Sequence, residues 1–107
     1  MSVFSERIRE LVRLGRVRVS EHGYEELTED GIHTKDAVRG VSDMVLIEEY
    51  PDYPKGPCVL VLEHDRDGQP FHVVWGIPKD YTEPVVLITA YRPDPRRWDA
   101  TFTRRSV

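Results

Sequence analysis

The period of the apolar residues changes once along the chain, close to Met44. Before that point apolar side chains recur at helical spacing, and after it they form short runs bounded by glycine, proline and aspartate. Helices followed by strands predict an α+β protein whose helices pack on one face of an antiparallel sheet. With 107 residues the chain has room for one such domain and not for two.

Three helices are predicted in the first part of the chain. They cover residues 6–14, 21–29 and 34–39, with Ser5 and Ser20 capping the first two and Thr34 opening the third. Gly23 weakens the second prediction, because glycine costs about 1 kcal/mol relative to alanine inside a helix. Residues 17–20 are expected to form a short extended link.

The second part of the chain predicts a meander of roughly four antiparallel strands, with the last two near its centre. These strands cover residues 44–50, 58–64, 71–77 and 85–91. Within the third, His72 points to the face opposite Trp75. We expect one domain over residues 1–107, with a core of about 5–98 and an irregular tail over 92–107.

Composition and charge exclude several classes of protein. The sequence has no run of about 20 apolar residues and no N-terminal apolar stretch, so neither a membrane span nor a secretory signal is expected. Cys58 is the one cysteine, which excludes an intramolecular disulfide framework and favours a reducing cytoplasm.

Charge is distributed in blocks. The net charge of -4 argues against indiscriminate binding of nucleic acid, yet residues 6–18 and 92–107 each carry five arginines and a net charge of +3. Guanidinium groups suit the recognition of phosphate or carboxylate. The alternative is that these two stretches are solvated surface segments that pair with the acidic middle of the chain. This alternative explains the charge pattern equally well.

One set of residues has the chemistry of a catalytic site: His22, His72, Tyr91 and Arg92. An imidazole moves protons near neutral pH, a phenol donates or orients, and a guanidinium stabilises charge on phosphate. These three groups fit a reaction in which a ribose 2′-hydroxyl attacks the neighbouring phosphate. No metal ion or cofactor is expected for this reaction. The structural alternative is that His72 and Tyr91 are satisfied sheet residues and that His22 belongs to a helix cap.

Several short motifs also carry a family resemblance. They are Ser20-Glu-His22, Gly31-Ile32 and the segments 47–52, 70–74 and 88–93. Their order and spacing over roughly residues 17–98 resemble a small bacterial family of domains of unknown function. Members of that family are similar to the RelE, HigB and MqsR toxins of type II toxin–antitoxin systems.

The resemblance implies a RelE-like fold, metal-independent cleavage of mRNA, on or off the ribosome, and a tight complex with an antitoxin. The antitoxin is expected to be a zinc-finger protein of the MqsA type or a helix-turn-helix protein. Whether this chain forms a homodimer is left open. The residues that match the family by position are Ser20, His22, His72, Thr89 and Tyr91. The residues predicted for catalysis are His22, His72, Tyr91 and Arg92, and those predicted for RNA binding are Thr89, Arg96 and Arg97.

The chain departs from the family pattern after its first histidine. Where the family has two arginines, this chain has Glu26 and Asp30. Two anions beside a phosphate weaken its binding by several kcal/mol where screening is poor. If these positions face RNA, the chain binds RNA badly, and if they face solvent or an antitoxin, nothing catalytic follows.

Three functions therefore remain open. The first is a toxin-like ribonuclease, and the second is a catalytically inactive protein-interaction module of the same fold with a basic partner. The third is a small-molecule-binding protein that uses Trp75 and the aromatic loop from Tyr50 to Tyr53.

Overall fold

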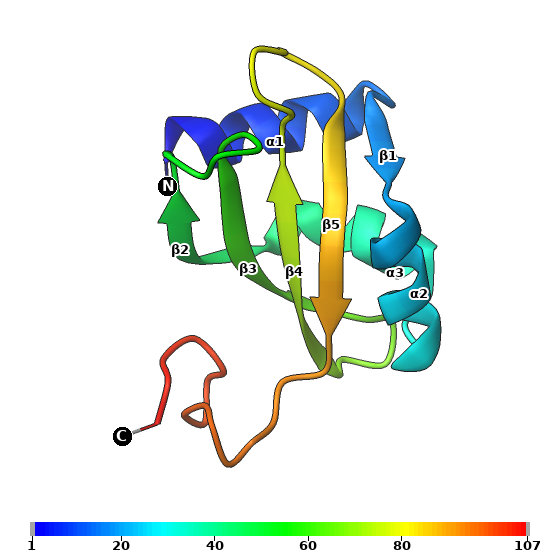
Figure 1. Cartoon of the computed structure of the whole chain (residues 1–107). Helices are drawn as coiled ribbons and strands as arrows, with labels where there is room; N and C mark the ends of the chain where they lie inside the picture. Colours follow the sequence, from blue (N-terminus) through cyan, green and yellow to red (C-terminus); the bar gives the residue numbers. More distant parts are fainter. Residues whose placement is uncertain (1, 107) are drawn as a thin grey trace.

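Three helices and a five-stranded sheet make up the part of the chain that the structure, a computed structural model, describes, residues 2–106 (Figure 1). In chain order the elements are α1 (Val3–Arg13), β1 (Val17–Val19), α2 (Glu21–Glu29), α3 (Thr34–Arg39), the short 3-10 helix η1 (Gly40–Asp43), β2 (Val45–Tyr50), β3 (Cys58–His64), β4 (Pro70–Gly76) and β5 (Val85–Tyr91). The α+β class is confirmed. Within the described residues, no helix has the length and apolarity that crossing a membrane requires.

The sheet is mixed, with the strand order β1-β5-β4-β3-β2. Strands β2 to β5 form the expected antiparallel meander, and β1 lies parallel to β5, with Val17 opposite Val85. The predicted four-stranded antiparallel sheet is therefore wrong, because residues 17–19 form a strand and not a link. Three residues are too few for alternation to distinguish a strand from a link, and their partner strand lies far along the sequence.

Strand β2 forms the other edge of the sheet and is irregular. Its register against β3 shifts between Leu46 and Glu48, which leaves Ile47 without a direct partner. A bulge of this kind bends the strand and increases its local twist. Glu48 and the exposed Glu49 follow the bulge directly.

The helix caps follow local sequence, with one correction. Helix α2 begins as predicted, because the Ser20 hydroxyl accepts the Gly23 N–H at 2.9 Å. Helix α1 begins at Val3, and its cap is Ser2, whose side chain accepts the Ser5 N–H at 3.0 Å. The prediction of Ser5 as the cap is wrong: Ser5 lies buried in the first turn, where its hydroxyl accepts a hydrogen bond from Ser2 at 2.8 Å.

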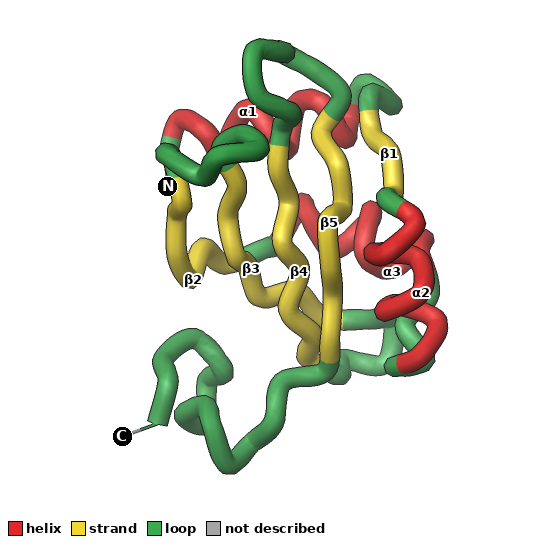
Figure 2. The backbone as a smooth tube through the Cα atoms, in the orientation of Figure 1, coloured by secondary structure: helices red, strands yellow, loops and turns green. Residues whose placement is uncertain are grey.

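The helices cover one face of the sheet, with α1 and α3 behind the strands in Figures 1 and 2 and α2 at the side of the sheet, below β1 and next to β5. Alternate residues of the central strands point into the core between the two layers. They include Val59 and Val61 of β3, Phe71, Val73 and Trp75 of β4, and Val85 and Leu87 of β5, which pack with Ile8, Leu11 and Leu27 of the helices.

Glu63 places a carboxylic acid in this core. Its side chain is 1% exposed and its Oε2 accepts a hydrogen bond from the Trp75 indole N–H at 2.9 Å. Its Oε1 has no partner among the described residues and lies against Gly40, where a Cβ atom would collide with it. Burial raises the pKa of Glu63 to about 8, against a smaller opposing effect of the Trp75 hydrogen bond, so the carboxyl is protonated at neutral pH.

Gly23→Ala should destabilise the protein by about 1–3 kcal/mol, although alanine is the better helix former. A Cβ at Gly23 would lie 2.7 Å from the carbonyl oxygen of Leu87, so α2 would have to move away from β5. The midpoint of urea unfolding measures the effect, with Glu25→Ala on the exposed side of the same helix as the control. Equal midpoints for the two variants would contradict the requirement for close packing.

Candidate functional site

The face of the sheet turned away from the helices, here called the open face, carries three of the predicted site residues: His72, Thr89 and Tyr91. The register of β4 and β5 places His72 opposite Tyr91 and Val74 opposite Thr89. These residues point to the open face because Val73, between the two β4 positions, points into the helix-covered core. The prediction that His72 lies on the face opposite Trp75 is confirmed.

His72 and Tyr91 form a hydrogen-bonded pair. The Tyr91 hydroxyl lies 3.2 Å from Nδ1 of His72, and Nε2 of His72 lies 2.7 Å from the carbonyl oxygen of Phe102. A carbonyl only accepts, so Nε2 carries the proton, and Nδ1 accepts the hydrogen bond that the Tyr91 hydroxyl donates. The imidazole is thereby fixed in one tautomer, with its basic nitrogen facing the phenol.

Burial sets the charge states of this pair. The side chain of His72 is fully buried, and this burial lowers its pKa, despite the Phe102 hydrogen bond. Burial also raises the pKa of Tyr91, which is only partly buried. Both groups are neutral near pH 7, and Tyr91 is the member of the pair that reaches the surface.

Residues 93–106, here called the covering segment, enclose His72 from the outside. They leave the end of β5 and turn back beneath the sheet toward β2, as the long loop at the bottom of Figure 2 shows. The ring of Trp98, 8% exposed, meets the His72 ring edge-on at 4.5 Å between centroids. Arg105 stacks over Trp98 at 4.9 Å and forms an ion pair with Glu48 of β2.

The sequence did not identify the members of the covering segment that enclose His72. Trp98, Phe102 and Arg105 lie in a stretch that has no apolar period. The one available signal was a tryptophan in an otherwise polar segment, since large aromatic side chains are usually well buried.

A hollow of about 480 Å³ opens beside the pair. Its walls are formed by the end of β5 and the covering segment: Tyr91, Arg92, Asp94, Arg97, Trp98 and Arg105. Asp94, the one carboxylate in these walls, pairs with Arg96 at 3.2 Å. Among residues 2–106, no carboxylate forms an ion pair with Arg97. Arg92 and Arg105 pair with Asp65 and Glu48, so Arg97 is the wall cation that has no carboxylate partner among the described residues.

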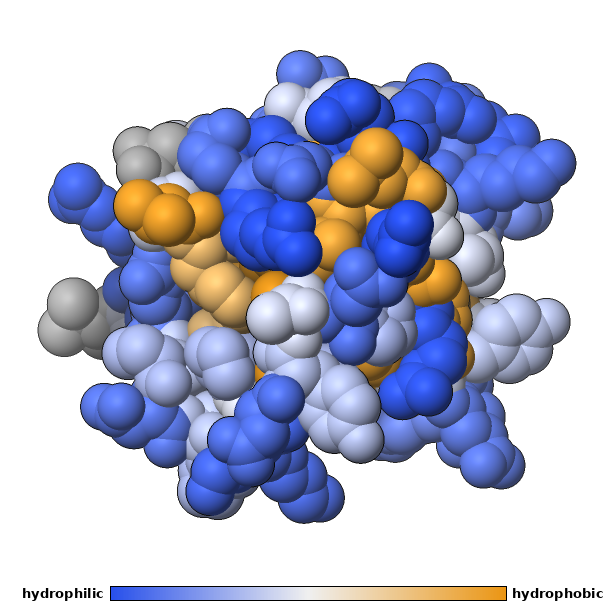
Figure 3. Space-filling model, turned by 90° about the horizontal axis from the view of Figure 1, so that it is seen from above, coloured by the Kyte–Doolittle hydropathy of each residue, from blue (hydrophilic) through white to orange (hydrophobic). Residues whose placement is uncertain are grey.

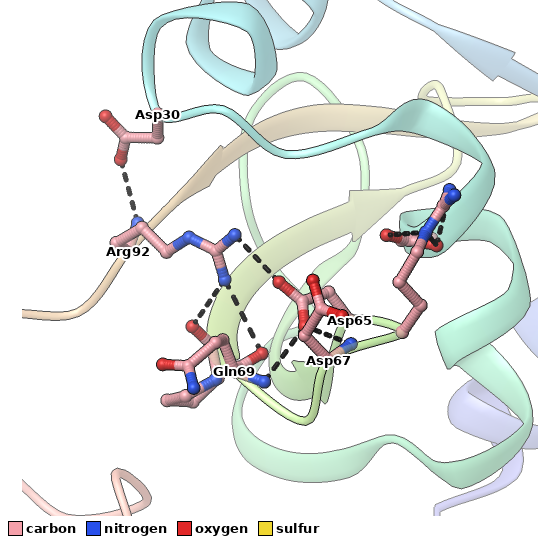
Figure 4. A network of polar contacts seen from close by, with 8 residues as sticks. Asp30, Asp65, Asp67, Gln69 and Arg92 are labelled. Carbon is pink, nitrogen blue, oxygen red and sulfur yellow. Dashed lines mark hydrogen bonds and ion pairs between the residues drawn. The ribbon is translucent and has the colours of Figure 1, made fainter.

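Arg92 acts mainly as a structural clamp (Figure 4). Its guanidinium donates to Asp65 at 2.9 Å and to the carbonyl oxygen of Pro70 at 3.2 Å, and its backbone N–H donates to the Asp30 carboxylate at 2.8 Å. Although burial opposes it, hydrogen bonds from the Gln69 N–H and from Arg92 lower the pKa of Asp65. The charge of Arg92 is thus compensated within the protein.

Asp30 and Glu26, the two acidic departures from the family pattern, lie in different surroundings. Asp30 ties the end of α2 to the end of β5 through the Arg92 N–H. Glu26 lies 3.8 Å from Nε2 of His22 on the same helix. Neither carboxylate is among the residues that line the hollow.

The remaining predicted residues are spread more widely. His22 lies on α2, with 64% of its side chain exposed, and is absent from the walls of the hollow. Arg96 is 89% exposed and pairs with Asp94. Thr89 lies partly exposed on the open face, two residues before Tyr91. The structure therefore brings His72, Tyr91, Arg92 and Arg97 together and leaves His22 and Arg96 outside.

Another hollow, of about 660 Å³, lies on the helix-covered side, between α1 and the α3–η1 region. Seen from above, in Figure 3, apolar patches lie between charged side chains on the α1 end of the molecule. Val3 and Leu14, at the two ends of α1, are 88% and 52% exposed. This hollow contains none of the predicted site residues.

Comparison with known proteins gives one match. The family described as a domain of unknown function, DUF4258, matches residues 19–92. The match begins at Val19, the last residue of β1, covers α2 to β5, including His72 and Tyr91, and stops before the covering segment. Neither a curated protein nor a solved structure matches the chain.

Proposed function

The chain belongs to the DUF4258 family, and we propose that it is a toxin-like ribonuclease that cleaves mRNA by attack of the ribose 2′-hydroxyl. One observation carries this proposal. The Tyr91 hydroxyl is hydrogen-bonded to a neutral His72 and opens on a hollow with Arg97 and Arg105 in its walls. A proton acceptor, the pair of Tyr91 and His72, thus lies beside Arg97, a cation that suits a phosphodiester.

The geometry supports a proton relay through Tyr91. With a phosphodiester in the hollow, the 2′-hydroxyl gives its proton to the Tyr91 oxygen, while Tyr91 passes its own proton to Nδ1 of His72. The 2′-oxygen bonds to phosphorus, the bond from phosphorus to the 5′-oxygen breaks, and the leaving 5′-oxygen takes a proton from solvent water. Neutral His72 has a free lone pair at Nδ1, and its N–H bond to the Phe102 carbonyl stabilises the imidazolium that forms. Arg97 stabilises the negative charge that develops on the phosphate, and Arg105, which pairs with Glu48, lies in the same wall.

The sequence motifs resemble a family of domains whose members are similar to RelE, HigB and MqsR toxins, and this resemblance supports the same substrate. The same resemblance implies an antitoxin partner of the zinc-finger or helix-turn-helix type. It also implies that the mRNA is cleaved either free or on the ribosome. The catalytic roles of this proposal go to Tyr91 and His72. Arg92 positions the end of β5 through its clamp, and His22 has no role in the relay.

Purified protein incubated with mRNA, with and without ribosomes and in the presence of a chelator, tests this function. We expect fragments that end in a 2′,3′-cyclic phosphate, because the 2′-hydroxyl is the nucleophile. An RNA that carries a single 2′-deoxynucleotide at the cleavage site should stay intact there. Message that remains whole under all conditions would reject the proposal.

A specific observation favours a second function, the catalytically inactive interaction module. Both ring nitrogens of His72 are already hydrogen-bonded and the covering segment encloses the ring, as in a satisfied structural histidine. Growth after induced expression separates the two functions. Growth arrest that Tyr91→Phe abolishes, with the variant still folded, would contradict the inactive module.

A further inference from the structure

The opposite end of the open face carries a separate hollow of about 320 Å³. Its walls come from β1, β4, β5 and the loop between β2 and β3. The register aligns Arg18 of β1, Val86 of β5 and Gly76 of β4 in one row across the sheet. The aromatic loop that sequence analysis identified thus forms one side of a real cavity, through Tyr53.

Two glycines shape this hollow. A Cβ atom at Gly76 would lie 2.8 Å from Cδ1 of Ile88 and 3.1 Å from Cβ of Cys58, so the floor has room for no further side chain there. Gly56 has a φ angle of 129°, and a Cβ atom there would collide with the Ile77 carbonyl. The loop can approach the end of β4 closely only with glycine at this position.

The charged side chains in the walls of this hollow are all cationic. Arg18 and Lys55 are both exposed, and among the described residues neither forms an ion pair with a carboxylate. No aspartate or glutamate lines the hollow. Val86 and Ile88 supply an apolar floor, and the ring of Tyr53, which is 50% exposed, stands at the rim.

We propose that this hollow is a second nucleotide subsite for single-stranded RNA. The base lies on the apolar floor and stacks on the Tyr53 ring, and the phosphate lies between Arg18 and Lys55. Aromatic stacking combined with cations on a backbone track is how proteins bind single strands. The volume is that of a small-ligand site and suits one nucleotide.

This subsite rests on the proposed function, because it lies on the same strand as the candidate active site. Ile88 and Tyr91 are three residues apart on β5, which corresponds to about 10 Å along the strand. The partly exposed Thr89 lies between them on the open face. One RNA strand can therefore follow β5 with its scissile phosphate beside Tyr91 and a flanking nucleotide on Tyr53.

Binding of a fluorescent 2′-O-methyl RNA tetranucleotide, which has no 2′-hydroxyl to react, tests the subsite without cleavage. We expect Tyr53→Ala to weaken binding about tenfold or more, because stacking on an aromatic ring is lost. Arg18→Ala should weaken binding and reduce the slope of log Kd against log salt by about one phosphate contact. Tyr24→Ala on α2, where Tyr24 is 60% exposed, and Arg13→Ala on α1 are the matched controls and should change neither.

Nuclear magnetic resonance titration with 3′-nucleoside monophosphates and with inorganic phosphate locates the ligand. We expect nucleotide-dependent shifts at Val86 and Ile88, and weaker binding of inorganic phosphate, which cannot stack. Wild-type affinity in both Tyr53→Ala and Arg18→Ala would overturn the subsite, even if the protein cleaves RNA. Nucleotide binding here without any RNA cleavage would keep the subsite and reject the ribonuclease.

Discussion

The protein should lose several kcal/mol of its free energy of unfolding as the pH rises from about 5 to 8, and Glu63→Gln should remove most of that loss. The Glu63 carboxyl has a pKa of about 8 in the folded chain against an ordinary value of 4.5. Between these values the folded state holds a proton that the unfolded chain has released, so stability falls with rising pH. A shift of this size corresponds to about 5 kcal/mol.

The range from pH 6.5 to 8 isolates this effect. His72 contributes with the opposite sign, because burial lowers its pKa below 6.5 and its contribution to stability grows as the pH rises toward that value. Above pH 6.5 the His72 contribution changes by only a few tenths of a kcal/mol, whereas Glu63 should cost about 2 kcal/mol by pH 8.

Urea unfolding of the native protein, Glu63→Gln and Glu49→Gln at half-unit steps of pH measures this dependence. Glu49 is exposed on β2 and serves as a control that removes a carboxylate without touching the core. Parallel pH profiles for the native protein and Glu63→Gln would show that the buried carboxyl is not the titrating group.

The second large effect is expected from Tyr91→Phe, which should slow RNA cleavage about 10²- to 10⁴-fold, the usual range for losing a positioned proton-transfer group. The substitution removes only the hydroxyl that lies 3.2 Å from Nδ1 of His72. Affinity for uncleavable RNA should change little, since Arg97 remains in the hollow. Stability should fall by about 1 kcal/mol, because the buried Nδ1 loses its partner.

Single-turnover cleavage rates and anisotropy measurements on the same preparations separate these effects. Tyr81→Phe is the matched control, since Tyr81 is 69% exposed in the loop before β5 and takes no part in the hollow. If Tyr91→Phe cleaves RNA as fast as the native protein, the relay through Tyr91 and His72 is wrong. A loss confined to affinity would instead make Tyr91 a binding residue.

The sequence predicted the fold well wherever its signals were local. The bounds of α2, α3, β3 and β5 agree with the predicted ranges 21–29, 34–39, 58–64 and 85–91. Each of these segments has its own cap, glycine stop or run of apolar residues. Strand β1 has none, because its three residues become a strand only through parallel pairing with β5.

The candidate site was predictable to the extent that it follows from strand alternation. Alternation places His72 and Tyr91 on one face, and adjacent strands bring the two side chains together. The clamp between Arg92 and Asp65 and the enclosure of His72 by Trp98 depend on turns and irregular backbone, which leave no period in a sequence. Gly23 was interpreted as weakening α2, but the close packing of α2 on β5 requires it. This tertiary contact also leaves no period in the sequence.

The irregular edge strand β2 also bears on how copies of this protein meet. An edge strand presents unpaired backbone groups to which a strand of another molecule can add, the route to β-mediated aggregation. The bulge at Ile47 interrupts that template, and two copies that paired there would bring the Glu49 carboxylates into mutual repulsion. The bulge and the exposed Glu49 therefore oppose the edge-to-edge addition of a second copy at β2.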